Sequence, residues 1–274
     1  MNSSPKVSIV TICRNCVSEI EETLRSVISQ DYDNKEYIVI DGASTDGTTE
    51  IIKNYLNYID IFVSEADTGV YNAMNKGVQY ATGDWCLFMN GGDRFVSDDV
   101  IRRMFYNRNP SMKTKVYFGN TWERYKNGQS VLLRAMPVWP TITRCQPYIH
   151  QSAFFNIVEK KKPFYNEKYR IVSDYNTSLW YFRKYGKKSF EYVDVAVSSY
   201  KNFDGISSIG ENQQKIAQEF LRVWTHYPIC WPRYIKEVVK YFIIFVQPFK
   251  RLRKKMLEFN SKKIIENKNS RTLE

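Results

Sequence analysis

The most informative stretch for chemistry is residues 84–93, Asp-Trp-Cys-Leu-Phe-Met-Asn-Gly-Gly-Asp, an apolar run that ends in two glycines and a carboxylate. An aspartate at the carboxyl end of a buried strand, behind glycines that let a ligand approach the backbone, is well placed to bind a divalent cation that bridges phosphates. Asn, Gly and Asp are also the usual turn-forming residues, so an ordinary strand-to-turn junction is the alternative. On the functional interpretation, Asp93 is the predicted metal ligand and Asn90 lies in the same turn.

Short β-rich runs alternate with segments of helical periodicity through the first hundred residues. The predicted strands are Lys6–Ile12, Glu36–Ile40, Asp60–Ser64 and the apolar run before Asn90, and the predicted helices are Val17–Ser29, Thr48–Leu56 and Tyr71–Ala81. This alternation predicts parallel strands joined by crossover helices, and so an open α/β sheet that binds its ligand beyond the carboxyl ends of its strands. The polar residues at those ends are Thr11 and Asn15, Asp41–Thr48, Ser64–Gly69 and Asn90–Asp93.

Four motifs in this order resemble the nucleotide-sugar-binding half of family 2 glycosyltransferases with the GT-A fold. They read VSIVTI followed by an Asn, VIDGASTDGT, SEADTGVYNAMNKG, and ATGDW followed by FMNGGD. Within that family the sequence is most similar to the bacterial surface-polysaccharide, colanic-acid-type branch, which tends to carry Asn-x-Gly-Asp where other members have Asp-x-Asp. The resemblance covers roughly residues 5–205 and implies a Rossmann-like, mostly parallel sheet flanked by helices.

The resemblance implies that the second strand end binds the base of the sugar nucleotide. Asp41 matches the first aspartate of the family's Asp-Asp-Gly-Ser-type motif, whose carboxylate accepts the N3–H of uracil, and this favours a UDP-sugar or a dTDP-sugar. Gly42 stands where the motif has its second acid, which leaves a second base or ribose contact unsupported. Asp46, in the same loop, fits a ligand contact and a cap of the following helix equally well.

The remaining donor residues come from the same resemblance. Asn75 and Lys76 match the family's donor-loop motif, where Lys76 would neutralise diphosphate charge unless it is an ordinary solvated lysine. The full set of expected donor-binding residues is Thr11, Asn15, Asp41, Asp67, Asn75, Lys76 and Asn90.

Asp93 matches the last carboxylate of the family's metal motif, while Asn90 and Gly92 replace acids of other branches. One carboxylate can suffice for Mn²⁺ or Mg²⁺ if the diphosphate supplies most of the ligands. The ion would stabilise negative charge on the departing nucleoside diphosphate.

A second carboxylate opens the predicted helix that runs to Tyr185. Residues 172–175, Val-Ser-Asp-Tyr, resemble the family's Glu-Asp-like or Ala-Asp-Tyr motif, which implies that Asp174 is the general base. An inverting displacement needs one carboxylate to take the proton of the acceptor hydroxyl. The alternative is a helix cap, for which the N-terminal position is expected to lower the pKa of Asp174.

The acceptor side of the site is predicted around His150 and Gln151. The resembling branch carries a His-Gln pair about two dozen residues before the base, as this chain does. His150 would contact the acceptor or the outer shell of the metal, or it is a satisfied structural group. Asn127-Gly128, between Trp122–Tyr125 and Ser130–Arg134, predicts a hairpin beside this region.

The cysteines do not indicate a metal site or a disulfide framework. Cys13-x-x-Cys16 lacks a second pair at zinc spacing, and the total of five cysteines is odd. Together with an N-terminus that has no apolar signal segment, this predicts a cytoplasmic protein in a reducing compartment.

The basic charge is concentrated at the C-terminus. Residues 228–274 hold twelve Lys and Arg against four Glu, which is +8 of the total net charge of +11. Apolar residues at helical spacing lead into the cluster Lys250–Lys255, but the longest uncharged run, Tyr241–Phe249, is too short to span a bilayer. We therefore expect a GT-A domain over residues 1–205, with a donor half to about 110 and an acceptor half from about 111, and a basic helical extension over 206–274.

The extension either binds an anionic membrane surface on the inner face of the cell membrane or packs on the domain. A membrane anchor would suit an acceptor saccharide carried on a polyprenyl diphosphate, the usual arrangement in the resembling family.

Other classes of function fit the sequence less well. Nucleic-acid binding is disfavoured because acidic motifs crowd the predicted sheet crevice while the positive charge lies outside it. A nucleotidyltransferase should carry a Gly-rich, basic phosphate loop after the first strand, which residues 11–15 are not. A catalytically inactive sugar-nucleotide-binding homologue is the remaining alternative, and the presence of Asp41, Asp93 and Asp174 argues against it.

Overall fold

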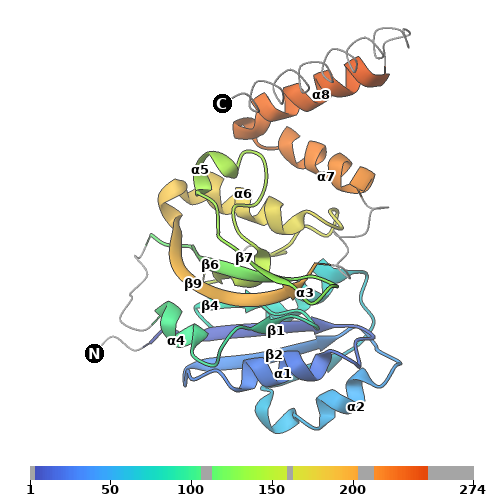
Figure 1. The fold of residues 1–274 in the computed structure, drawn as a ribbon, viewed down its shortest axis with the longest axis vertical. Helices are drawn as coiled ribbons and strands as arrows, with labels where there is room; N and C mark the ends of the chain where they lie inside the picture. Colours follow the sequence, from blue (N-terminus) through green and yellow to red (C-terminus); the bar gives the residue numbers. More distant parts are fainter. Residues whose placement is uncertain (1–3, 106–112, 159–162, 203–212, 246–274) are drawn as a thin grey trace, which may run out of the picture. The chain divides into compact units, whose positions relative to one another are not determined.

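Strands and helices alternate through the first hundred residues, as the sequence predicts (Figure 1). The computed structural model describes residues 4–105, 113–158, 163–202 and 213–245. The strands are β1 (Val7–Cys13), β2 (Lys35–Asp41), β3 (Ile61–Ser64), β4 (Trp85–Phe88), β5 (Arg94–Phe95), β6 (Val116–Arg124), β7 (Ser130–Leu133), β8 (Ala153–Asn156) and β9 (Phe190–Lys201). The α-helices are α1 (Ile20–Ile28), α2 (Thr48–Lys53), α3 (Val70–Tyr80), α4 (Val100–Phe105), α5 (Val138–Thr141), α6 (Ser173–Tyr185), α7 (Gln213–Thr225) and α8 (Trp231–Phe245).

The described strands form one mixed sheet in the order β3-β2-β1-β4-β8-β6-β9-β5, with β7 paired to β6. Its first four strands are all parallel, which confirms the predicted crossover arrangement. The second half is mixed, because β8 runs antiparallel to both β4 and β6 while β9 runs parallel to β6. The predicted hairpin is also present: β6 and β7 pair antiparallel around a turn in which Gly128 has φ +83°.

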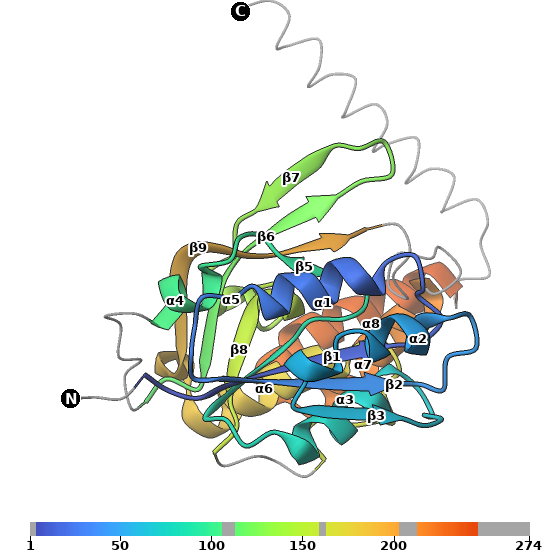
Figure 2. The same cartoon turned by 90° about the horizontal axis from the view of Figure 1, so that it is seen from below.

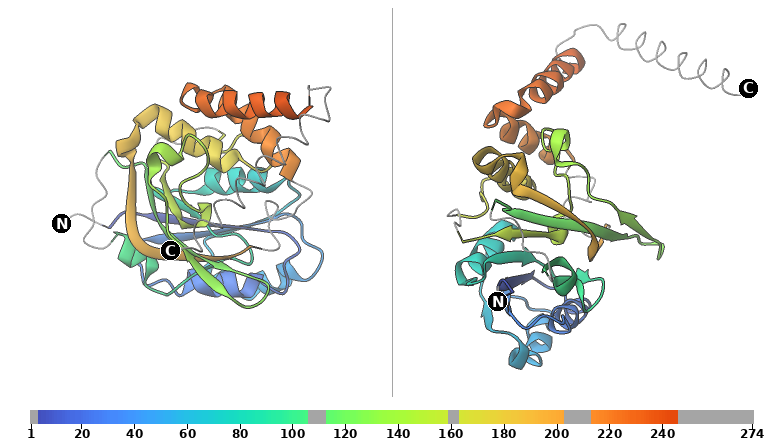
Figure 3. Two further views of the ribbon diagram at one scale, coloured as in Figure 1. Left: turned by 45° about the horizontal axis from the view of Figure 1, so that its top comes forward. Right: turned by 90° about the vertical axis from the view of Figure 1, so that its left-hand side faces the viewer.

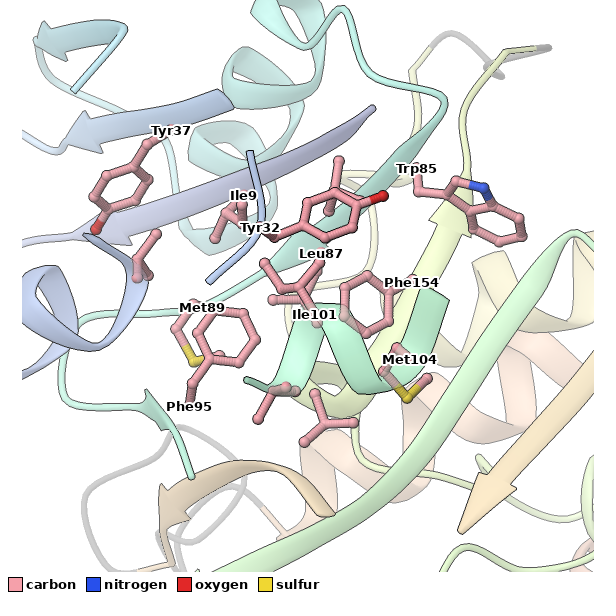
Figure 4. Packing of buried hydrophobic residues seen from close by; sticks show 14 of the residues in the cluster. Ile9, Tyr32, Tyr37, Trp85, Leu87, Met89, Phe95, Ile101, Met104 and Phe154 are labelled. Atoms are coloured by element: carbon pink, nitrogen blue, oxygen red, sulfur yellow. The ribbon is translucent and has the colours of Figure 1, made fainter. Parts of the chain in front are cut away.

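Helices cover both faces of the sheet (Figure 2 and Figure 3). Alternate β1 residues point to opposite faces: Val7 and Ile9 join the core under α1, α2 and α4, while Val10 and Ile12 join the core under α3 and α6. Figure 4 shows the first of these cores, where Ile9, Leu87 and Phe154 from three strands pack with residues of α4. Burial on two faces explains why the inner strands read as continuous apolar runs.

The chain divides into two compact units, residues 1–223 and residues 224–274. The sheet lies in the first unit, which also holds nearly all of α7, a helix that the predicted boundary after residue 205 assigns to the extension. The second unit contains α8, on which Trp231 and Ile235 are exposed. The basic cluster Lys250–Lys255 lies outside the described residues. Within the described part, none of the helices has the length and apolar character needed to cross a bilayer.

Candidate active site

Backbone and side-chain hydrogen bonds tie the carboxyl ends of the parallel strands together. The Gly42 N–H donates to the Cys13 carbonyl at 2.8 Å, and the Gly91 N–H donates to the Ile12 carbonyl at 2.9 Å. Asn15, with φ +50°, accepts the Thr45 N–H on its side-chain oxygen at 2.9 Å and donates its own N–H to Ser44 Oγ at 2.8 Å. The predicted strand-end residues therefore do form one edge, and Asn15 lies exposed on it.

Asp41, the last residue of β2, is not exposed at that edge. Its side chain is fully buried, and one oxygen accepts from Ser64 Oγ at 2.6 Å and from the Ser44 N–H at 3.0 Å. The other oxygen accepts from Ser44 Oγ. Both carboxylate oxygens thus fix the loop after β2, and the buried Asp41 is not accessible to a uracil N3–H in this conformation.

Asp67 occupies the space next to Gly42. A side chain at position 42 would overlap the Asp67 carboxylate, which explains why this chain has glycine where the resembling motif has a second acid. Asp67 also accepts the Gly69 N–H at 3.0 Å, which shapes the start of α3. The carboxylate that position 42 lacks is therefore supplied in the same place by the loop after β3.

Three further expected donor residues, Lys76, Thr11 and Asn75, have protein partners. Lys76 Nζ pairs with the Glu65 carboxylate at 2.8 Å and donates to the Ala66 carbonyl at 2.8 Å. Buried Thr11 bonds the Tyr37 hydroxyl at 3.0 Å. Asn75 is buried and bonds both the N–H and the carbonyl of Tyr165, at 2.7 and 2.9 Å. Thr11 and Asn75 are both buried and bond other parts of the protein. A contact between either residue and the donor stays a prediction.

Asp46 precedes Gly47, the N-cap residue of α2, and binds backbone on both sides of the loop. Its side chain accepts the Thr48 N–H at 3.0 Å and the Val17 N–H at 3.0 Å. Asp46 thus accepts the N–H of the first residue of α2 without occupying the N-cap position, and its contact with a ligand stays a prediction.

Asp93 is almost fully buried, at 8% exposure, in the turn between β4 and β5. Burial raises its pKa to about 7, opposed by the Gln151 amide and by the guanidinium of Arg124. The Gln151 amide donates to Asp93 at 2.9 Å, and Arg124 donates to the carbonyl of Gly92 at 2.7 Å. Gln151, predicted for the acceptor side, therefore contacts the predicted metal ligand.

The turn can hold a divalent cation only with help from the ligand. Among the described residues there is no cluster of three or more His, Cys, Asp or Glu that could bind a metal. The side-chain oxygen of Asn90 is buried and has no hydrogen-bond partner in the described part of the chain. Because Mg²⁺ and Mn²⁺ prefer oxygen ligands and keep several from water or phosphate, Asp93 and Asn90 fit such an ion.

Asp174 begins α6, and its pKa differs from the expectation. Burial raises the pKa to about 6, although the backbone N–H of Tyr175 and the hydroxyl of Tyr71 lower it. The Tyr71 hydroxyl lies 3.2 Å from Asp174 Oδ1, but it has a shorter contact, 2.7 Å, with the Ile171 carbonyl. The predicted lowering by the helix N-terminus is therefore wrong, since desolvation outweighs the favourable helix position.

Aromatic rings connect the two carboxylates. His150, next to Gln151, stacks on Phe88 with 5.1 Å between ring centroids and hydrogen-bonds the Tyr165 hydroxyl. Tyr165 packs in turn on Tyr71, with centroids 5.2 Å apart. Burial lowers the pKa of His150 to about 3, so this ring is neutral. Of its open roles, the structure favours the structural one.

Glu219 is a site residue that the sequence did not reveal. It comes from α7, is buried, and accepts three consecutive backbone N–H groups: Arg170 at 2.8 Å, Ile171 at 2.9 Å and Val172 at 3.1 Å. These residues lead directly into Asp174. A single Glu in an amphipathic helix carries no motif, so only the tertiary structure identifies it as the clamp of this segment.

Comparison with known proteins places the chain in a family. The sequence pattern of Glycosyl transferase family 2 matches residues 8–185. An uncharacterized glycosyltransferase of Mycobacterium tuberculosis, Rv1514c, is 38% identical over 102 residues, which are 37% of this chain and 39% of that protein. A PGL/p-HBAD biosynthesis glycosyltransferase of Mycobacterium bovis is 26% identical over 212 residues, or 75% of this chain and 80% of that protein.

Two solved structures share the fold. TarS 1–349 of S. aureus in complex with UDP-GlcNAc has a TM-score of 0.62 at 16% identity, covering 89% of this chain and 76% of that one. The mannosyltransferase PcManGT of Pyrobaculum calidifontis, in complex with GDP-Man and Mn²⁺, has a TM-score of 0.58 at 16% identity, covering 82% and 64%. The chain thus spans less than two thirds of some relatives, but the match over residues 8–185 and the mixed α/β architecture agree: it belongs to glycosyl transferase family 2 and has the GT-A fold.

Proposed function

We propose that this chain is an inverting glycosyltransferase that moves a sugar from a UDP-sugar to a hydroxyl of a glycan or lipid-linked saccharide in bacterial surface polysaccharide synthesis. The main support for the proposal is Asp174, a partly buried carboxylate in the first turn of α6 with a pKa of about 6, which lies 3.2 Å from the Tyr71 hydroxyl of α3. A base with this pKa is largely ionised at neutral pH and still basic enough to take a proton.

The chemical step follows from the roles of the two carboxylates. The acceptor hydroxyl gives its proton to Asp174 as its oxygen bonds the anomeric carbon of the donor sugar. The bond from that carbon to the diphosphate oxygen breaks on the opposite side, and the electron pair leaves with UDP. The Tyr71 hydroxyl lies 3.2 Å from Oδ1 of Asp174 and 2.7 Å from the Ile171 carbonyl, and its single proton is shared between these two acceptors.

Asp93 and Asn90 would hold Mn²⁺ or Mg²⁺ when the donor is bound, and the ion would supply positive charge to the departing diphosphate. Gln151 keeps Asp93 oriented through its 2.9 Å hydrogen bond. The complex of PcManGT with GDP-Man and Mn²⁺ supports the metal requirement.

The donor nucleotide is proposed from two sources. Asp41 matches the family's uracil-binding aspartate, and the TarS complexes contain UDP or UDP-GlcNAc. PcManGT instead holds GDP-Man, and GDP-mannose is therefore the informative alternative donor.

The test is a donor screen that measures nucleoside diphosphate release from a panel of UDP-hexoses, with GDP-mannose as the counter-donor. Each donor is assayed with a lipid-diphosphate saccharide acceptor, with and without manganese. We expect acceptor-dependent and manganese-stimulated release of UDP. Release of GDP alone would reject the UDP assignment, and failure of every donor to bind would reject the function.

A further inference from the structure

A cavity of about 310 Å³ lies between the β6–β7 hairpin and the segment before His150. Its apolar walls come from residues such as Leu132, Leu133, Met136 and Pro147. The Met136 N–H donates to the Pro147 carbonyl at 2.7 Å, which joins the two walls. This volume is at the lower end of the range for small-molecule pockets, enough for about one sugar ring.

Gln146 is one of the lining residues, and its buried amide makes no hydrogen bond within the described residues. Neither the oxygen nor the nitrogen of the amide is exposed, and neither makes a hydrogen bond within the described part of the chain. Among the other polar side chains of the wall, Thr121 donates to Ser152 at 2.6 Å, and the exposed Arg134 has one nitrogen 3.3 Å from Asp194. Turning the Gln146 side chain toward the cavity therefore breaks no hydrogen bond.

The apolar side chains of the wall and the Gln146 amide together favour one class of ligand. A Gln amide offers both a donor and an acceptor, and one group that satisfies both at once is another amide. A sugar hydroxyl placed against the apolar part of the wall would lose its water without gaining a partner, which is unfavourable. An acetamido group combines an amide with a methyl that the apolar wall can cover.

The cavity lies on the side of the proposed base. The hydroxyl of Tyr148, which also lines the cavity, bonds Ser178 Oγ at 2.8 Å, and Ser178 Oγ donates to the Asp174 carbonyl at 3.0 Å. The lining residues all follow residue 118, and the donor edge built by β1, β2 and β3 contributes none.

We infer that this cavity binds the acetamido group of an N-acetylhexosamine in the acceptor, recognised by the Gln146 amide. The inference rests on the proposed function for its assignment to the acceptor. It identifies an acceptor class and a residue that selects it.

The test compares N-acetylglucosamine with glucose as free-sugar probes on the full chain, because the two differ by a single acetamido group. Binding is measured by saturation-transfer NMR with UDP and manganese present. We expect N-acetylglucosamine to bind about tenfold more tightly than glucose, the value of one neutral hydrogen bond. Gln146→Met should abolish this preference, and the matched Gln129→Met change on the exposed hairpin turn should preserve it.

Two further readouts keep the result independent of folding defects. Gln146→Met removes an unpaired buried amide, so the ligand-free variant should melt at the same temperature as the parent or about 2–4 °C higher. Leu133→Trp fills the cavity from the opposite wall and should block N-acetylglucosamine with Gln146 intact.

Equal binding of the two sugars by the parent chain, or an unchanged preference in Gln146→Met, would overturn the inference. A Gln146→Met chain that binds UDP-N-acetylglucosamine poorly but free N-acetylglucosamine normally would assign the acetamido group to the donor and also overturn it. If the chain binds UDP normally but does not distinguish N-acetylglucosamine from glucose, the inference about the cavity fails and the proposed function stands. If the chain prefers N-acetylglucosamine but does not bind UDP, the proposed function fails and the inference about the cavity stands.

Discussion

Asp174, the proposed base, lowers the stability of the fold at neutral pH. Its pKa of about 6 in the folded chain lies above the ordinary value, so protonation stabilises the fold. That stabilisation is complete below the unfolded pKa near 4 and is lost as the pH rises through about 6. At neutral pH the ionised carboxylate therefore lowers the free energy of unfolding.

Asp174→Asn should separate function from stability. The amide keeps an oxygen for the Tyr71 hydroxyl but accepts no proton, so turnover should fall about 10²–10⁴-fold with UDP-sugar affinity unchanged. The melting temperature at pH 7 should rise, because a partly buried charge is gone. Turnover, calorimetric donor binding and thermal melting check this; weakened donor binding with normal turnover would place Asp174 on the donor side instead.

The same base predicts a pH profile. Below a pH of about 6 Asp174 is increasingly protonated, so turnover at saturating donor, acceptor and manganese should fall toward tenfold per pH unit. Initial rates between pH 5 and 8 measure it. A flat profile across this range would mean that a group other than Asp174 accepts the proton.

Asp93→Asn should remove manganese-stimulated transfer while the fold persists, because one carboxylate carries the protein's negative charge at the predicted ion. Manganese titration of the rate and calorimetry of manganese with UDP measure the change. Asp84→Asn at the start of the same segment is the matched control, since Asp84 is exposed and bonds the Lys6 N–H at 2.9 Å. Wild-type stimulation in Asp93→Asn would show that Asp93 is not a ligand.

Residue types and order identify the carboxylates of this site but not the depth at which each lies. Asp41 and Asn75 stand in recognisable motifs, yet both are buried with their hydrogen bonds filled by Ser44, Ser64 and Tyr165. Those partners are set by tertiary packing, which motif spacing does not encode. For the same reason the sequence does not predict the desolvation that raises the Asp174 pKa.

At the scale of elements, periodicity predicts the parallel half of the sheet well because each strand is buried on both faces and adjoins its own crossover helix. The mixed half is different. The pairing of β4 with β8 joins Cys86 to Phe155, and the pairing of β5 with β9 joins Arg94 to Ser199. Pairings between segments so distant in sequence leave no local pattern, which is why only the β6–β7 hairpin, with its Asn-Gly turn, was predictable there.

The clamp from α7 makes a prediction about α6. Glu219→Gln replaces one accepting oxygen by an N–H₂ group that faces backbone donors, so residues 170–172 should loosen and Asp174 should lose its orientation. We expect turnover to fall about tenfold or more with little change in donor affinity. Hydrogen exchange should quicken at the start of α6, whereas Glu50→Gln on the exposed face of α2 should change neither quantity.

If hydrogen exchange at the start of α6 slows in Glu219→Gln, or if the variant loses only donor binding, then Glu219 does not position the base. Rescue by Glu219→Asp is not expected, because the shorter side chain cannot reach all three N–H groups.

At the scale of the whole molecule, the concentration of charge after residue 228 predicts membrane association. Each Lys or Arg near an anionic leaflet contributes about 1 kcal/mol, and five such residues lie within Lys250–Lys255. The full chain should sediment with anionic liposomes at low salt. Neutralising these five residues should release it without loss of transfer to a short soluble acceptor; equal partitioning of both forms would reject the electrostatic anchor.

The contact of Glu219 with residues 170–172 also bears on the synthesis and truncation of the protein. The last residue predicted for the site is Asp174, and the family match ends at residue 185. Glu219 emerges from the ribosome later, after a segment that no motif marks. A nascent or truncated chain ending at residue 205 would hold every recognisable catalytic group yet lack the carboxylate that secures the segment leading to its base. If Asp174 is the base as proposed, a chain that ends before residue 219 should turn over more slowly than the full chain, because it lacks the acceptor of these three N–H groups.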